Sequence, residues 1–169
     1  MQPTREQAWE WLKEYTKSEA LRRHALTVEG CMRHFAALAG EDAELWGVVG
    51  LLHDLDYEQY PDEHCKKVQE ILREKDVDPA IIRAVASHGF GICSDIEPES
   101  RMEKTLYAID ELTGLITAAA IMRPSKSVMD LELKSVKKKY KTPSFAAGVN
   151  RAVVEQGAQR LGATVDELI

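Results

Sequence analysis

Apolar residues recur along the chain at helical spacing, in segments separated by short polar breaks. The first segment repeats at the i, i+3, i+4, i+7 intervals of one helix face, at Ala8, Trp11, Leu12 and Tyr15. Thr4 and Gln7 stand at the spacing of a capping box, so we expect this helix to begin at Thr4. The same reasoning predicts further helices over about 18–39, 42–54, 61–75, 79–88, 100–122 and 143–161.

The segments between these helices carry the residues typical of loops and turns. The stretch GFGICSDIEPES, residues 89–100, is rich in Gly, Pro, Ser and Asp and is expected to form a loop. Lysine-rich amphipathic turns follow Pro124 as far as about Lys141. No segment alternates with the period of two that a half-buried strand requires. The pattern therefore predicts an all-α protein, a compact bundle of about seven helices with short connections.

The histidines can be placed on helix faces, because each residue turns a helix by about 100°. His24 lies beside the apolar row of its predicted helix, whereas His34 lies nearly opposite that row. His64 stands one turn before the aliphatic row of the helix 61–75, and His88 flanks the aliphatic row of its own helix. We therefore expect His24, His64 and His88 to face inward and His34 to face outward.

Two predicted helices place carboxylates among apolar residues. The helix 42–54 is apolar on almost every side, as expected of a central buried helix, and it ends in His53 and Asp54. In the helix 100–122, Asp110 interrupts a stripe of apolar and small residues. A buried carboxylate without a partner is very costly, so it pairs with a cation, takes up a proton or binds a metal ion.

These inward residues are best explained together. Taken singly, each is more simply a hydrogen-bonded core residue. One metal centre accounts for all of them at once, with His24, His53, Asp54, His64, His88 and Asp110 as its ligands. Imidazole and carboxylate without thiolate suit one or two divalent ions of Mn, Fe, Co, Ni, Zn or Mg. Helical bundles often build such centres from facing helices.

Composition and charge narrow the class of protein. The 169 residues carry 22 Lys and Arg against 28 Asp and Glu, a net charge of −6, which disfavours general nucleic-acid binding. No apolar stretch approaches the ~20 residues that span a bilayer, so no membrane partner is expected. The odd number of cysteines, without a CxxC spacing, indicates a reducing cytoplasm and argues against a disulfide framework.

The ordered set of His24, His53-Asp54 and Asp110 resembles the H…HD…D signature of the HD-domain metal-dependent phosphohydrolase superfamily. The stretches GLLHDLDY, SHG and AIDELTGLI are similar to those of small single-domain hydrolases of the HDIG type. Leu55 and Asp56 stand where that subgroup has Ile and Gly. The chain lacks a Gly-Tyr-Pro signature, so hydrolysis of cyclic di-GMP is not expected.

The resemblance implies a ligand set and a domain organisation. His24, His53, Asp54 and Asp110 would hold a first ion, and members with two metals add two histidines between the HD pair and the final Asp. His64 and His88 occupy those places, with Asp54 as the bridging ligand on which catalysis depends. A single HD domain would span 1–169, with its metal-binding core at about 18–122 and C-terminal helices at 125–169 packed on it.

The implied activity is hydrolysis of a phosphomonoester or phosphodiester bond in a small, nucleotide-like substrate. A bound divalent ion lowers the pKa of water, so that hydroxide is available near neutral pH. Two alternatives stay open. The same His and Asp set serves diiron oxygenases of the HD fold, and it also fits a nucleotide-sensing module with little turnover.

A phosphorylated substrate needs cationic contacts, for which the sequence offers several candidates: Arg23, Lys67, Arg123, Lys126 and Lys138. The lysine-rich run that includes Lys138 is equally typical of a solvated helix face. The loop 89–100 follows His88 and is a candidate gate to the site.

Three further carboxylates lie near the motifs in sequence: Asp56, Glu58 and Glu111. Each is a candidate to orient a ligating histidine or to move a proton, although a surface position is the simpler expectation. Trp9 stands off the main apolar row of the first helix and is compatible with a homodimer contact or with ordinary packing.

Overall fold

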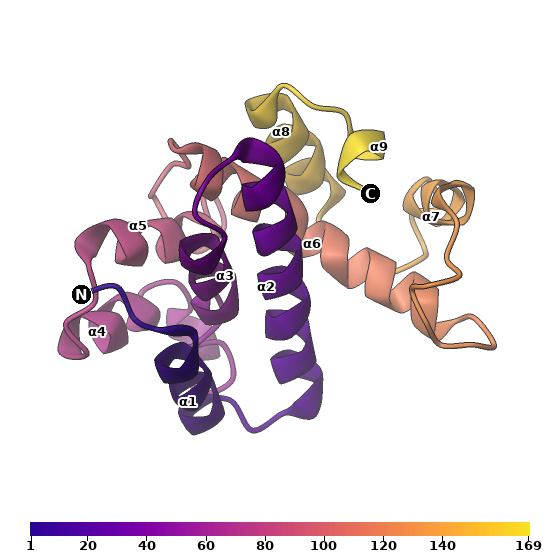
Figure 1. Ribbon diagram of the computed structural model, residues 1–169. Coiled ribbons are helices and arrows are strands. Elements are labelled where there is room, and N and C mark those ends of the chain that lie inside the picture. The colour runs from indigo at the N-terminus through magenta and orange to yellow at the C-terminus, as the bar shows by residue number, and fades with distance from the viewer. The chain divides into compact units, whose positions relative to one another are not determined.

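The computed structural model describes all residues from Met1 to Ile169, and its regular elements are all helical (Figure 1). The predicted all-α class is confirmed. The elements are α1 (Arg5–Tyr15), α2 (Glu19–Ala39), α3 (Ala43–Leu52), the 3-10 helix η1 (Pro61–Glu63), α4 (Lys67–Glu74), α5 (Pro79–Ser87), α6 (Arg101–Ile121), α7 (Leu133–Tyr140), α8 (Arg151–Leu161) and α9 (Val165–Leu168).

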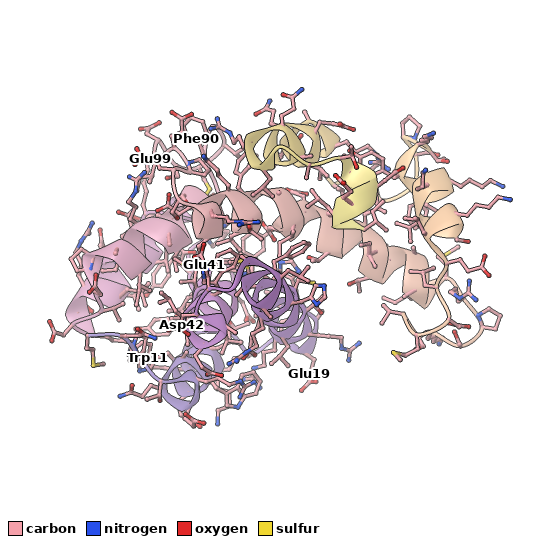
Figure 2. The ribbon with its side chains drawn as sticks, turned by 45° about the horizontal axis from the view of Figure 1, so that its top comes forward. Trp11, Glu19, Glu41, Asp42, Phe90 and Glu99 are labelled. Carbon is pink, nitrogen blue, oxygen red and sulfur yellow. A yellow bond between two sulfur atoms is a disulfide. The ribbon has the colours of Figure 1, made fainter.

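Polar caps determine where the first three helices begin. Thr4 and Gln7 form the predicted capping box at the start of α1. The Ser18 hydroxyl accepts a hydrogen bond at the start of α2. Asp42, labelled in Figure 2, accepts hydrogen bonds from two backbone N–H groups in the first turn of α3. Gly40, with φ of 70°, ends α2 in the left-handed conformation that glycine adopts readily.

The predicted helix 61–75 is interrupted in its first half. The 3-10 helix η1 ends at Glu63, His64 is extended with ψ of 143°, and α4 begins only at Lys67. The buried Asp56 carboxylate stabilises this interruption of the helix. It accepts hydrogen bonds from His64 Nδ1 and from the Val68 backbone N–H. His64 therefore does not lie on the helix on which the sequence pattern placed it.

The predicted helix 143–161 also begins later than expected. Asn150 caps α8, so that only residues 151–161 are helical. The Arg151 guanidinium donates hydrogen bonds to the backbone carbonyls of Tyr140, Thr142 and Phe145, which folds the preceding segment into turns. The lysine-rich turns contain the regular helix α7, and a short α9 ends the chain. Nine α-helices thus replace the seven expected from the pattern.

The chain forms two compact units, Met1–Tyr107 and Ala108–Ile169. In the first unit α3 is central: it contacts α1, α2 and α5, and its residues from Trp46 to Leu52 are all buried. The predicted position of this apolar helix is confirmed. No helix of the protein is both long enough and apolar enough to cross a membrane. The division into one domain with packed C-terminal helices stays a prediction.

Helices α2 and α3 run side by side in close contact (Figure 1). Gly50 on α3 makes this approach possible, because an added Cβ would lie 3.0 Å from Met32 Cγ and 3.1 Å from the Val28 carbonyl oxygen of α2. The Gly50 carbonyl also accepts a hydrogen bond from the His53 ring, three residues further on. Packing of α2 against α3 thus positions the HD pair.

We expect Gly50→Ala to lower the free energy of unfolding by about 1–3 kcal/mol, because the added methyl group overpacks the contact between the two helices. Gly30→Ala on α2 is the matched control. No atom lies within 4 Å of a Cβ added at Gly30, so this variant should gain about 0.5–1 kcal/mol from the better helix propensity of Ala. Urea denaturation of both variants is the measurement. Equal effects would contradict the role given to Gly50.

Candidate metal centre

The HD pair lies where the buried helix α3 ends. His53 is fully buried, and the Asp54 side chain is 19% exposed. The chain turns immediately afterwards, as the Leu55 N–H donates to the Leu52 carbonyl and the Tyr57 N–H donates to the Asp54 carbonyl. A buried apolar helix followed at once by turns carries a carboxylate into the interior of the first unit.

The two oxygens of Asp54 face two different pairs of histidines. Asp54 Oδ2 lies 3.2 Å from His53 Nε2 and 3.5 Å from His24 Nε2. Asp54 Oδ1 lies 3.4 Å from both His64 Nε2 and His88 Nε2. Within each pair the two Nε2 atoms are 3.2 Å apart. The arrangement offers two adjacent ligand positions with Asp54 shared between them.

The rings are held with their Nδ1 atoms turned away from this centre. His53 Nδ1 donates to the Gly50 carbonyl at 2.7 Å, and His88 Nδ1 donates to the Val85 carbonyl at 2.6 Å. His64 Nδ1 donates to the Asp56 carboxylate at 2.7 Å. These acceptors place the ring proton on Nδ1 and leave the Nε2 lone pairs directed at the centre. This is the tautomer that a metal ion requires.

The local charges favour an ionised Asp54. Burial raises the pKa of this carboxyl group, but His53 and His88, when protonated, donate hydrogen bonds and contribute positive charge that hold the pKa well below its usual range. When the rings are neutral, a divalent cation would supply that positive charge instead. The acceptor-only carboxylate among four nitrogen lone pairs suits divalent ions that accept both nitrogen and oxygen ligands. The donor set therefore fits the metals expected from the sequence.

Asp56 is buried, contrary to the surface position expected for it. Its carboxylate accepts from His64 Nδ1 and, at 2.9 Å, from the Val68 N–H. It thus orients a candidate ligand, which is the other role considered for it. The sequence feature that could have indicated this role is the position of Asp56 in the run His-Asp-Leu-Asp, directly after a buried helix. Glu58 instead accepts from the Lys17 and Ser18 N–H groups.

His34 and Asp110 were both placed on helix faces from the sequence pattern, and the structure shows the exposure of each. His34 is exposed, as predicted. Asp110 is half-buried on α6, and its backbone carbonyl accepts a hydrogen bond from the Thr113 hydroxyl. It lies three residues beyond Tyr107, in the second unit, so its role as a ligand stays a prediction. In that unit Glu111 accepts a hydrogen bond from the Asn150 N–H.

Two of the basic candidates are already paired with acidic side chains. In the first unit, Arg23 is exposed on α2, and Lys67 forms an ion pair with Glu70 at 2.6 Å. In the second unit, Arg123 pairs with Asp130 at 3.0 Å, which offsets its charge. Lys126 and Lys138 are exposed. Contact of any of these residues with substrate stays a prediction.

An aromatic residue that no sequence pattern indicated lies beside the centre. Tyr57 is 47% exposed, and its ring meets that of His64 edge to face with the centroids 5.2 Å apart. Its position three residues after Asp54 gave no periodic signal, because it lies in a turn.

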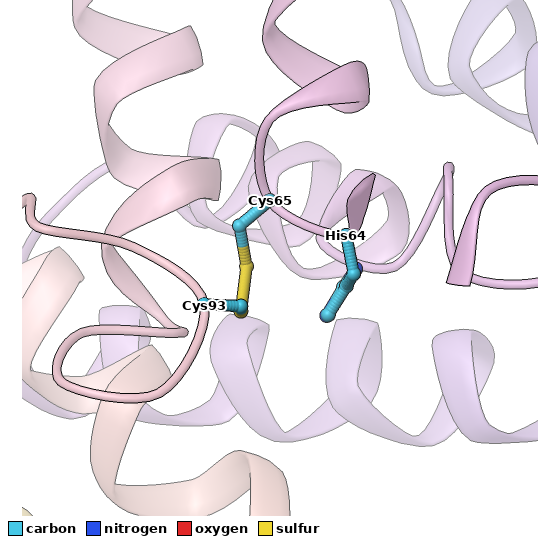
Figure 3. A group of neighbouring side chains, drawn as sticks. All are labelled: His64, Cys65 and Cys93. Atoms are coloured by element: carbon cyan, nitrogen blue, oxygen red, sulfur yellow. A yellow bond between two sulfur atoms is a disulfide. The ribbon is translucent and has the colours of Figure 1, made fainter. Parts of the chain in front are cut away.

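The cysteines differ from the reduced set expected. Cys65 and Cys93 are joined by a disulfide (Figure 3), whereas Cys31 is a free, half-buried thiol whose pKa is raised by burial. The separation of 28 positions between Cys65 and Cys93 concealed the pairing, because only tertiary folding brings the two segments together. The bond ties the loop 89–100, the predicted gate, to the residue after His64. Figure 2 marks that loop near its two ends, at Phe90 and Glu99.

Comparison with known families agrees with the geometry. The family model of the HD domain matches residues 21–115, more than half of the chain, and the protein belongs to this family. Members of the family are generally metal-dependent hydrolases that bind divalent ions. No curated protein and no solved structure matches the chain significantly. The matched range contains all the candidate ligands.

We expect Asp56→Asn to weaken metal binding by about 10–100-fold at the position that uses His64, because the amide replaces one of the two acceptor oxygens that orient its neighbours. Isothermal titration with Mn²⁺ measures the effect. Glu58→Gln is the matched control, since that carboxylate receives only backbone N–H groups outside the centre. Equal affinities in the two variants would show that Asp56 does not orient the ligand.

Proposed function

We propose that the protein is a metal-dependent phosphohydrolase that cleaves a phosphomonoester or phosphodiester bond of a small, nucleotide-like substrate. One observation carries the proposal. The two oxygens of Asp54 face separate pairs of imidazole Nε2 atoms, at 3.2–3.5 Å, as a carboxylate bridging two ions requires. Membership of the HD-domain family supports the same conclusion.

In this proposal the residues divide into two ligand positions. His24, His53 and Asp54 would hold the first ion, with Asp110 on α6 as its remaining ligand. His64, His88 and Asp54 would hold the other ion. The ions come from the divalent series Mn, Fe, Co, Ni, Zn and Mg, since imidazole and carboxylate accept all of them.

When bound at these positions, divalent ions would lower the pKa of water and neutralise charge on the phosphoryl oxygens. The protein supplies the orientation. His53 and His88 are buried beneath the centre, whereas the side chains of His24, Asp54 and His64 are 24%, 19% and 15% exposed. Substrate therefore approaches from the side of His24 and His64.

Tyr57 supports the nucleotide-like class of substrate. Its exposed ring stands next to His64 on the accessible side of the centre, where it offers an aromatic face to a base or a sugar. His53, His64 and His88 have their ring protons on Nδ1, turned away from the centre, so in this proposal they act as metal ligands and donate no proton to a leaving group.

The remaining expectations accompany this proposal. The partner is a small phosphorylated molecule, because the net charge of −6 opposes general nucleic-acid binding. Binding to membranes is not expected. Cytoplasmic localisation and a homodimer stay predictions.

We expect Asp54→Ala to abolish phosphate release and to reduce metal content while helicity is retained, because both ligand positions lose their shared oxygen atoms. The measurement is phosphate release from nucleotides and phosphomonoesters with Mn, Fe(II), Co, Ni, Mg or no added metal. His34→Ala is the control, since that ring is exposed on the same helix as His24, and it should change neither quantity.

The outcomes separate the proposed activity from its alternatives. Metal-dependent release that disappears in Asp54→Ala supports the hydrolase. Loss of activity in both variants would contradict the assignment of the ligands. A wild-type protein that binds metal and releases no phosphate from any substrate would favour a diiron oxygenase or a nucleotide sensor instead.

The number of ions is tested separately. We expect His64→Ala, and likewise His88→Ala, to lose one equivalent of metal, because each ring belongs to only one ligand position. Metal analysis after dialysis measures the stoichiometry, with His34→Ala again as the control. Unchanged stoichiometry would indicate a mononuclear centre at His24, His53 and Asp54.

A further inference from the structure

Two sulfur atoms lie against the second ligand position. Cys65 follows His64 directly, and its Sγ is 3.9 Å from His88 Nε2. The ligand atoms of His64, Cys65 and Cys93 all lie within 4.8 Å of one another (Figure 3). His64 Nε2 and His88 Nε2 are themselves 3.2 Å apart. His64 therefore lies beside both sulfurs, and His88 lies beside the sulfur of Cys65.

The backbone is shaped to hold these sulfurs there. Cys65 has φ of 66°, a conformation rarely adopted by residues other than glycine. Gly89, the neighbour of His88, leaves the space in which they lie, because a Cβ at Gly89 would collide with Sγ of both Cys65 and Cys93. The Cys93 N–H donates to the Gly89 carbonyl at 2.9 Å, which closes the turn.

We propose that Cys65 and Cys93 form a reversible dithiol pair, and that the reduced sulfurs together with His64 and His88 make a thiolate–imidazole site for Zn²⁺. Two thiolates and two imidazoles are the ligands of tetrahedral zinc sites. When the disulfide forms, neither sulfur is a thiolate ligand, and His64 and His88 are available to the second ligand position of the metal centre. The proposal rests on the proposed function, because it uses two histidines of that centre.

The redox step is a thiol–disulfide exchange with a small dithiol. A thiolate of the dithiol attacks Cys93 Sγ, since Cys93 is half-buried and Cys65 is fully buried. The S–S bond breaks, Cys65 leaves as a thiolate and a mixed disulfide forms. The second thiol of the reductant then releases Cys93 and closes a cyclic disulfide. The protein gains two electrons and two protons, and both protons are released again when the sulfurs bind the ion.

The oxidation state thereby selects the type of ion at this position. Oxidised protein presents only imidazole and carboxylate, which accept Mn²⁺ or Mg²⁺ as well as Zn²⁺. Reduced protein adds two thiolates, and soft sulfur ligands favour Zn²⁺ over the harder ions. A zinc ion drawn to the sulfurs takes His64 and His88 from the second ligand position.

Titration with Co²⁺ tests the site without substrate, because Co²⁺ replaces Zn²⁺ and absorbs visibly, and a thiolate ligand adds a charge-transfer band in the near ultraviolet. We expect this band in wild-type protein reduced with dithiothreitol and its loss after reoxidation. Cys65→Ser and the double variant Cys65→Ser/Cys93→Ser should lack the full band but keep the visible absorption of Co²⁺ bound by histidine. Cys31→Ser, the matched control, should behave as wild type.

Several results would overturn the proposal. Visible Co²⁺ absorption in reduced wild type without the charge-transfer band would exclude sulfur ligands. So would a band that persists unchanged in the double variant. A thiol assay that finds the disulfide resistant to dithiothreitol in the folded protein would exclude the reversible step.

Failure here is distinguishable from failure of the proposed hydrolase. Metal-dependent phosphate release without the band overturns the thiolate site alone. The band without phosphate release from any substrate overturns the hydrolase alone and supports the thiolate site. Absence of Co²⁺ binding in every form of the protein overturns both.

Discussion

The structure depends on one carboxylate placed among four imidazoles at the end of a buried helix. Removing the charge of Asp54 from water carries a large free-energy cost, which only nearby cations or hydrogen-bond donors offset. The surrounding Nε2 atoms carry lone pairs, because the ring protons of His53, His64 and His88 are engaged elsewhere. A divalent ion satisfies both the carboxylate and the lone pairs. A bound divalent ion would therefore offset the free-energy cost of burying the Asp54 carboxylate in the folded protein.

Backbone irregularities, more than regular helices, complete this arrangement. Helix α3 ends abruptly, so that His53 and Asp54 point into the interior and not along a solvated face. The chain breaks again between η1 and α4, where buried Asp56 binds His64 and the first turn of α4 together. Gly89 then leaves room for the sulfurs of Cys65 and Cys93. Local departures from helical geometry therefore decide which ligand chemistry is available at the centre.

Helical periodicity was enough to predict the inward face of His24 and the exposure of His34, because both residues lie within the long regular helix α2. For His64, helical periodicity predicted the inward direction of the ring but the wrong backbone conformation. That ring does face the centre, but from an extended residue held by a tertiary hydrogen bond, which no periodic pattern describes. The same limitation explains why Asp56 was expected at the surface. A single Asp in a turn has no apolar row against which its direction can be judged.

The sequence by itself determined the all-α class, the central buried helix and the identity of the residues around the HD pair, since apolar periodicity and residue chemistry are local properties of the chain. The family resemblance implied that Asp54 is shared between two pairs of histidines, and the tertiary structure gave the contacts. Tertiary structure alone decided that Cys65 meets Cys93 and that buried Asp56 holds an extended His64 at the centre. It also decided which basic side chains are already paired with acids, as Arg123 is with Asp130. Such contacts join residues far apart or in irregular segments, and the folding of the backbone brings them together.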